Sequence, residues 1–217
     1  MNAQEFIELI QADFSLTDQQ KASFEAMDAL YREWNAQINV ISRKDIDGLY
    51  DHHVIHSLAI ARYLLTVPGL LEEFSHGQIL DLGTGGGFPG IPLAVLFPEA
   101  HFVLCDSVNK KTIVAQAVAS ALKLPNVQVV NDRAESLPQT FDFVVSRAVA
   151  SLVDFYPWVK GKYRKGILYL KGGDVVEEIS EVMSRHKLAR GSVHTWPVSS
   201  WLRDSYYDGK LVIHIEK

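Results

Sequence analysis

The fold of this 217-residue chain is indicated most clearly by the segment Asp81-Leu82-Gly83-Thr84-Gly85-Gly86-Gly87-Phe88-Pro89-Gly90. It lies between two short apolar runs, residues 78–80 and 91–97, and so predicts a strand, a glycine-rich turn and the start of a helix. The alternating glycines leave the backbone without Cβ atoms where it must bend sharply and approach a ligand closely. The helix that follows adds free N–H groups and the positive end of its dipole. The sequence therefore predicts a nucleotide-like cofactor at this loop.

Two spacings of the glycines predict different cofactors. Gly85, Gly87 and Gly90 fit the G-x-G-x-x-G pattern of dinucleotide-binding folds. Counting from Gly83 instead gives acidic-x-G-x-G-x-G, the first motif of S-adenosylmethionine (SAM)-dependent methyltransferases, and this pattern starts directly at the strand end. Asp81 can then face the cationic methionine end of SAM, whereas a buried carboxylate would repel a pyrophosphate. We expect SAM, with NAD(P) or a purely structural turn as the alternatives.

Asp106 supports a nucleoside ligand. It ends the apolar run 101–105, about twenty residues beyond the loop, where a doubly wound fold places a carboxylate against ribose hydroxyls. The alternative is that Asp106 only caps a helix beginning near residue 109, because Asp is a favoured cap. We assign Asp106 to the cofactor ribose, although adenosine is common to SAM and NAD.

Composition limits the class of protein. Residues of the hydrophobic types make up 47% of the chain, enough for a full core, and no run of roughly 18 apolar residues predicts a membrane helix. The single cysteine, Cys105, permits no internal disulfide, so we expect a cytoplasmic protein. The net charge is -5, but residues 77–217 carry a slight basic excess, which permits contact with phosphates.

The chain divides at residue 76. Residues 1–76 predict a helical segment, with a capping box at Thr17-Asp18-Gln19-Gln20 and a second helix start at Ser42-Arg43-Lys44-Asp45 that runs to about Leu65. Residues 77–217 predict a core of alternating strands and helices. The expected strands are 78–83, 101–106, 127–131, 141–146 and 166–171, and the expected helices are 90–97, 109–123, 151–159 and 174–185. Two further β segments, 187–196 and 210–216, predict a terminal hairpin. The fold class is therefore α/β, a doubly wound, mostly parallel Rossmann-like sheet with an N-terminal helical extension.

Several segments in order resemble one family. They are Asn39 to Asp45, His53 to Ser57, the glycine loop with Phe88-Pro89-Gly90, Asp106-Ser107 with Lys110-Lys111, Arg133-Ala134-Glu135, Ser146-Arg147-Ala148 and Leu170-Lys171-Gly172-Gly173. Together they resemble the bacterial RsmG (GidB) family of 16S ribosomal RNA guanine-N7 methyltransferases.

The resemblance implies methyl transfer from SAM to a guanine in the decoding-centre (530) loop of 16S rRNA, as naked RNA or in the 30S particle. It also implies a SAM site lined by Gly83, Phe88, Ala134, Glu135 and Arg147. The chain departs from the family pattern at His56, where Asp is common, and at Gly209-Lys210, where the family has a late arginine.

The chemistry that the residues allow agrees with guanine N7. Cytosine C5 methylation needs a cysteine nucleophile, and Cys105 is expected within a strand, away from the cofactor loops. Exocyclic-amine methyltransferases usually carry an Asn/Asp-Pro-Pro-aromatic segment where this chain has Ser146-Arg147-Ala148-Val149. Guanine N7 has a free lone pair, so the enzyme need only align it with the methyl group and exclude water, and no general base is expected.

Three residues after core strands are candidates for the site. Arg147 could position guanine O6, a phosphate or the methionine carboxylate through its planar fork, or could pair with Asp142 on the surface. Glu135 could meet the adenine edge or simply begin a helix. Lys171 could contact RNA phosphate or be an ordinary solvated lysine.

His52, His53 and His56 lie about one helical turn apart. Zinc needs further ligands, and the H-E-x-x-H pattern is absent, so we expect no metal. We expect His53 to face the core and to serve the RNA substrate.

The rivals to an rRNA methyltransferase are a small-molecule methyltransferase, an NAD(P)-binding oxidoreductase or redox sensor, and a non-catalytic RNA-binding module. We expect a monomer with no membrane partner.

Overall fold

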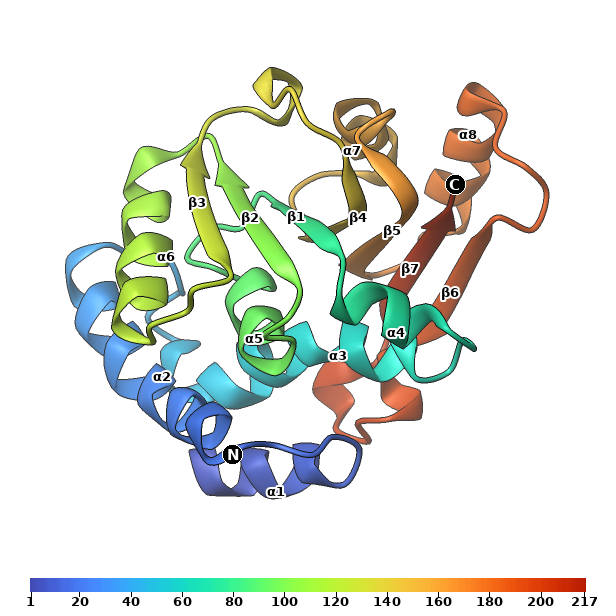
Figure 1. Ribbon diagram of the computed structural model, residues 1–217. Coiled ribbons are helices and arrows are strands. Elements are labelled where there is room, and N and C mark those ends of the chain that lie inside the picture. The colour runs from blue at the N-terminus through green and yellow to red at the C-terminus, as the bar shows by residue number, and fades with distance from the viewer.

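The computed structural model describes all residues, 1–217, and places a seven-stranded sheet at the centre of the molecule (Figure 1). The strands are β1 (Gln78–Leu82), β2 (His101–Asp106), β3 (Val127–Asn131), β4 (Phe141–Arg147), β5 (Tyr163–Gly172), β6 (Val193–Pro197) and β7 (Lys210–Glu216). Their order across the sheet is β3-β2-β1-β4-β5-β7-β6. The first five strands are parallel, and β7 runs antiparallel to both β5 and β6. The predicted parallel sheet with a terminal hairpin is confirmed.

The strand order reverses between β1 and β4, because the chain first builds outward through β2 and β3 and then returns to the other side of β1. In such sheets the carboxyl ends of the central strands open a crevice for ligands. The glycine loop leaves β1 at this point.

Helices cover both faces of the sheet. They are α1 (Ala3–Gln11), α2 (Asp18–Gln37), α3 (Ile55–Leu64), α4 (Leu70–Ser75), α5 (Gly90–Leu96), α6 (Asn109–Ala121), α7 (Leu152–Val159) and α8 (Val176–His186). One hydrophobic cluster joins α1 to α6 with alternate sheet residues such as Phe102 and Phe143. A second cluster joins α7 and α8 with the opposite set, including Val144 and Tyr169, as the period-2 alternation of strand side chains requires.

The N-terminal helices share the core of the sheet. Phe6, Phe24 and Met27 are fully buried in the same cluster as sheet residues Ile79 and Phe102. Thr17 and Gln20 form the predicted capping box at the start of α2. The proposed boundary at residue 76 falls between α4 and β1, and the division into two units stays a proposal.

Two element predictions are wrong. Residues 42–65 do not form one helix from a cap at Ser42: a short 3-10 helix, Ile46–Gly48, leads into a π-helix, Leu49–Val54, before α3 begins. The carboxylate of Asp45, expected in the first helical turn, is drawn instead to two histidine rings. The hairpin's first strand is also shorter than 187–196, because Lys187 and Gly191 take positive φ angles that end the helix and turn the chain. No helix combines the length and apolar character that crossing a bilayer requires.

Candidate functional site

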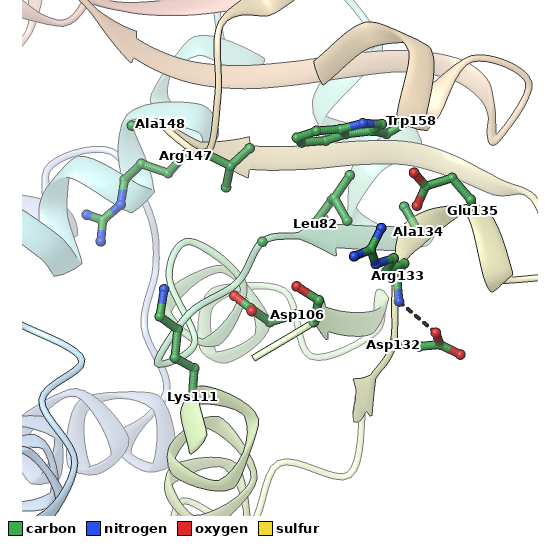
Figure 2. Close-up of a pocket in the computed structure, with 13 residues that line it drawn as sticks. Leu82, Asp106, Lys111, Asp132, Arg133, Ala134, Glu135, Arg147, Ala148 and Trp158 are labelled. Atoms are coloured by element: carbon green, nitrogen blue, oxygen red, sulfur yellow. Dashed lines mark hydrogen bonds between the residues drawn. The ribbon is translucent and has the colours of Figure 1, made fainter. Parts of the chain in front are cut away.

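A cavity of about 570 Å³ lies at the carboxyl ends of β1, β2, β3 and β4. Five residues predicted for the cofactor site line it, namely Gly83, Asp106, Ala134, Glu135 and Arg147. Figure 2 shows Arg147 and Lys111 toward one end, Glu135 and Asp132 toward the other, and Asp106 between them. A cationic end, a central carboxylate and a further acidic end form an elongated polar site.

The glycine loop bends through left-handed backbone at the mouth of this cavity. Gly83 has φ +70°, and a Cβ there would lie 2.2 Å from Cγ1 of Val149, so the loop and the segment after β4 touch only because Gly83 has no side chain. Gly85 has φ +57°, and a Cβ there would meet no atom within 4 Å. Gly85 therefore faces open space beside the cavity, although it is not among the lining residues.

Asp81 lies beneath the loop and is fully buried. Its Oδ2 accepts hydrogen bonds from Thr84 Oγ1 at 2.6 Å and from the Gly90 N–H at 2.8 Å, which fixes both ends of the turn. Its Oδ1 has no hydrogen-bond partner. Burial raises the pKa of Asp81 to about 7, against the hydrogen bonds from Thr84 and Gly90. Asp81 therefore holds the loop in its bent shape. Its Oδ1, which has no hydrogen-bond partner, suits a positively charged group nearby.

Asp106 ties the loop to β2. Its Oδ2 accepts from the Gly85 N–H at 2.9 Å, and its Oδ1 accepts from the Val108 N–H at 2.8 Å beside the start of α6. The carboxylate therefore supports both the loop and the turn into α6, and it also borders the cavity. Its proposed ribose contact would use the remaining lone pairs of the same two oxygens.

Ala134 and Glu135 lie on a short 3-10 helix, Ala134–Ser136, that follows β3. Ala134 is buried and Glu135 is exposed, and the indole of Trp158 from α7 closes the same end of the cavity (Figure 2). Ala134 and the Trp158 ring give this end apolar surface beside the charged groups of Asp132, Arg133 and Glu135.

Arg147 ends β4 and reaches across to the N-terminal segment. Its Nη1 donates to the carbonyl of His52 at 3.3 Å, its Nη2 lies 3.0 Å from His53 Nδ1, and its guanidinium carbon lies 5.2 Å from the centroid of the Phe88 ring. Phe88 is buried and packs under Arg147, away from the cavity lining. The alternative pairing of Arg147 with Asp142 is wrong, because Asp142 binds Arg164 Nε at 3.1 Å.

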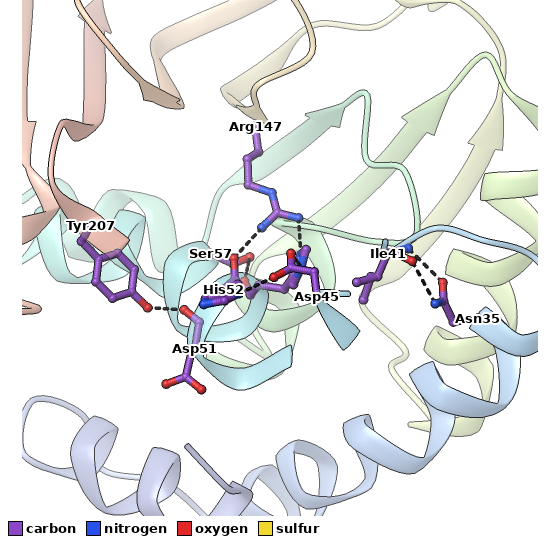
Figure 3. Close-up of polar contacts among 9 residues, drawn as sticks. Asn35, Ile41, Asp45, Asp51, His52, Ser57, Arg147 and Tyr207 are labelled. Carbon is purple, nitrogen blue, oxygen red and sulfur yellow. Dashed lines mark hydrogen bonds and ion pairs between the residues drawn. The ribbon is translucent and has the colours of Figure 1, made fainter. Parts of the chain in front are cut away.

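The histidines do not gather as a metal site. His52 and His53 converge on the carboxylate of Asp45, and Figure 3 shows His52 beside Asp45. No group of three or more His, Cys, Asp or Glu residues is arranged to hold a metal ion. His53 contacts Arg147 as well, so the structure brings it to the edge of the site. The sequence alone did not predict the contact of Asp45 with the two histidines. The signal that could have found it is an acidic residue seven positions before adjacent histidines.

Lys171 and Cys105 are occupied inside the protein. Lys171 Nζ lies 2.8 Å from Glu178 Oε2 and donates to the Ala150 carbonyl at 3.2 Å, so it is not a free phosphate ligand here. Cys105 is buried within β2, where burial raises the pKa of its thiol to about 11. A thiol of this kind is a poor nucleophile.

The N-terminal segment supports the loop from below. The Tyr31 hydroxyl from α2 donates to the Gly86 carbonyl at 3.0 Å, and a Cβ on Gly86 would lie 2.8 Å from a methyl of Val40. Asn35 Oδ1 accepts hydrogen bonds from the N–H groups of Val40 and Ile41, which holds Val40 in place. The helical extension therefore supports the glycine loop beside the cavity.

Comparison with known proteins gives consistent relatives. Residues 20–200 match the GidB family, described as rRNA small subunit methyltransferase G. The ribosomal RNA small subunit methyltransferase G of Flavobacterium psychrophilum is 47% identical over 209 residues, which cover 92% of each chain. The protein of the same description from Phocaeicola vulgatus is 48% identical and covers 93% of each chain.

Among solved structures, magnesium protoporphyrin IX methyltransferase from Synechocystis PCC 6803, solved with bound SAM, has a TM-score of 0.63. The alignment covers 94% of this chain and 99% of that one at 11% identity. Precorrin-6y C5,15-methyltransferase from Geobacter metallireducens has a TM-score of 0.53 at 12% identity, covering 83% of this chain and 91% of that one. At such identities the likeness establishes the fold alone, and it confirms the predicted methyltransferase fold class.

Proposed function

Because this chain belongs to the rRNA small subunit methyltransferase G family, we propose that it transfers the methyl group of SAM to N7 of a guanine in the 530 loop of 16S rRNA. Membership of this family identifies the chain as an rRNA methyltransferase of the small subunit. The cavity chemistry supports the choice of a guanine N7 target and of SAM as the donor. An NAD(P)-dependent oxidoreductase has no support from the relatives, which are methyltransferases by description.

The observation that carries the proposal is the set of side chains around the cavity. Its titratable lining residues are carboxylates, Lys111 and two arginines, and it contains no histidine, cysteine or tyrosine. A site without a thiol nucleophile or a histidine base suits an atom that already has a free lone pair, such as guanine N7. Catalysis then depends on alignment of the two reacting atoms and on exclusion of water.

The residues at the cavity fit SAM from end to end. SAM supplies an activated methyl group on a sulfonium centre. Ala134 and Glu135 would hold the adenine, Asp106 the ribose, and Arg147 the methionine carboxylate or the incoming guanine. Asp81 is fully buried and does not line the cavity, so it would serve the site by holding Thr84 and Gly90 at the two ends of the loop.

Cations at the rim suit an RNA substrate. Lys111 and Arg133 line the cavity, and neither forms a salt bridge within the protein. Each phosphate neutralised by such a side chain releases counterions, so RNA affinity should fall as salt rises.

Methyl incorporation into ribosomal particles tests the proposal. Purified protein is incubated with methyl-labelled SAM and 30S particles from cells that lack the gene. The 16S rRNA is then reduced with borohydride, which removes N7-methylguanine, and cleaved at the resulting abasic site with aniline. We expect label in 16S rRNA and one cleavage within the 530 loop, with little product from the Arg147→Ala variant. Label at another atom or another loop would leave the family assignment but reject the target.

Equilibrium dialysis separates the proposal from its rival. We expect the protein to retain SAM and S-adenosylhomocysteine and to leave NADH evenly distributed. Retention of NADH without SAM would reject the cofactor assignment.

A further inference from the structure

Arg147 is half-buried, and no carboxylate pairs with its guanidinium. Its contacts are the His52 carbonyl, the ring nitrogen Nδ1 of His53 and the face of Phe88. Burial lowers the pKa of Arg147, although nearby Tyr206 and Asp81 oppose this shift. Charged side chains are rarely buried without a partner, so the acceptors that hold this arginine decide where its remaining N–H groups point.

The lone pair that His53 offers to Arg147 depends on Asp45. His53 Nε2 lies 2.7 Å from Asp45 Oδ2, and His52 Nδ1 contacts Asp45 Oδ1. Burial favours protonation of Asp45, but hydrogen bonds from His52 and His53 outweigh it, and the net pKa lies below the ordinary value. An ionised carboxylate only accepts, so the proton of His53 resides on Nε2. Nδ1 is then left as an acceptor for the Arg147 Nη2–H.

The backbone is shaped to bring both rings to one carboxylate. His52 and His53 are consecutive residues of the π-helix Leu49–Val54, and π-helical turns are rare and frequent at functional sites. Gly48 lies just before this turn, and a Cβ there would come within 2.6 Å of His52 Nδ1. The outer face of His52 stacks on Tyr206, with ring centroids 3.8 Å apart. His52 is therefore held by Asp45, Gly48 and Tyr206, and His53 by Asp45 and Arg147.

We propose that Asp45 and His53 are positioning residues for the proposed methyl transfer: Asp45 fixes the tautomer of His53, and His53 aims the Arg147 guanidinium into the cofactor cavity. The inference rests on the proposed function, because it assumes that Arg147 acts on the cofactor or the guanine. The N-terminal segment thus contributes to the site through hydrogen bonds, in addition to packing beneath the loop.

Two substitutions of His53 test which nitrogen matters. The amide of Asn lies where Nδ1 was, so His53→Asn keeps an acceptor for Arg147 and loses the contact with Asp45. The amide of Gln lies where Nε2 was, so His53→Gln keeps the contact with Asp45 and loses the acceptor. Asp45→Asn weakens the choice of tautomer, and Asp47→Asn is the matched control, because Asp47 lies in the same segment but pairs only with Arg32.

The measurements are kcat and KM on 30S particles, the Kd of SAM, the melting temperature and the 15N shifts of the His53 ring. A misaligned arginine can cost about 100-fold in rate, so we expect about a 100-fold lower kcat/KM for His53→Gln, with the melting temperature close to that of His53→Asn. His53→Asn should retain at least about tenfold more activity than His53→Gln. In the wild type the ring should show a protonated Nε2 and an accepting Nδ1, and this preference should be lost in Asp45→Asn.

The outcomes separate two failures. A wild-type protein that methylates no RNA but shows the expected tautomer, with SAM affinity lost in His53→Gln and kept in His53→Asn, would reject the proposed function and retain the positioning role. Equal activity and equal SAM affinity in the two His53 variants, or a His53 tautomer unchanged in Asp45→Asn, would overturn the positioning role itself.

Discussion

Arg147 is the residue to which we assign the positioning role in the proposed methyl transfer. Sequence position placed it after a core strand, and the structure shows it bordering the cavity while its side chain contacts the N-terminal segment. A planar fork can satisfy the His52 carbonyl and His53 Nδ1 at once and still present N–H groups to a ligand. An ammonium group on a flexible stem cannot reproduce that arrangement.

Arg147→Lys should therefore separate activity from stability. We expect kcat/KM on 30S particles to fall by about 100-fold, while the free energy of unfolding in urea changes by about 1 kcal/mol or less. Arg164→Lys is the control, because Arg164 pairs with Asp142 on the surface, outside the cavity. If Arg147→Lys loses no more activity than Arg164→Lys, Arg147 has only a structural role.

The glycine loop is the element that joins β1 to α5 beside the cavity. Its shape depends on Asp81 and Asp106, which bind backbone N–H groups at Gly90 and Gly85, and on Tyr31 from α2. The alternation of glycines correctly predicted the turn. The support by Tyr31 joins residues far apart in the sequence, and no local pattern encodes such a contact.

Two alanine substitutions distinguish the steric roles of these glycines. Gly85→Ala should reduce stability by about 1–2 kcal/mol, the strain of a left-handed non-glycine residue, because its Cβ meets no atom within 4 Å. Gly83→Ala should add about 1–3 kcal/mol of overpacking against Val149 to the same strain. Urea unfolding of both variants measures the difference, and equal losses would show that the contact with Val149 relaxes freely.

The fold of the whole molecule could be predicted from the sequence wherever the hydrophobic pattern of a segment matches the side that the segment buries in the core. The five parallel strands, the closing hairpin and the Thr17 cap follow from hydrophobic periodicity and capping chemistry. The π-helix was not predictable, because its wide turn depends on tertiary contacts around Asp45. The same holds for Asp81: an acidic residue at a strand end could face the ligand or the loop backbone, and only the packed structure shows that it binds the backbone.

Buried histidines should make the stability of the whole molecule depend on pH. His214 on β7 is buried against the Tyr63 hydroxyl, and burial lowers its pKa to about 4. Between pH 4 and 6.5 the unfolded chain therefore binds a proton that the folded chain does not, and stability rises with pH, by about 3 kcal/mol at most for this group. Asp81 acts in the opposite sense, because its pKa is raised to about 7 and the folded state keeps that proton.

The variant His214→Asn keeps an acceptor for Tyr63 but cannot titrate. We expect its free energy of unfolding to rise less steeply than that of the wild type between pH 4 and 6.5, whereas Asp81→Asn should rise more steeply. Urea titrations across this range measure both slopes, and parallel curves for all three proteins would contradict the assigned pKa shifts.

We propose that this chain methylates one guanine of the small-subunit RNA at N7. Mass mapping of 16S rRNA from cells with and without the gene measures this methylation in the cell. We predict a single fragment from the 530 loop that is lighter by one methyl group when the gene is absent, and that regains this mass when the wild-type gene is restored. Identical 16S rRNA fragments from the two strains would contradict the account.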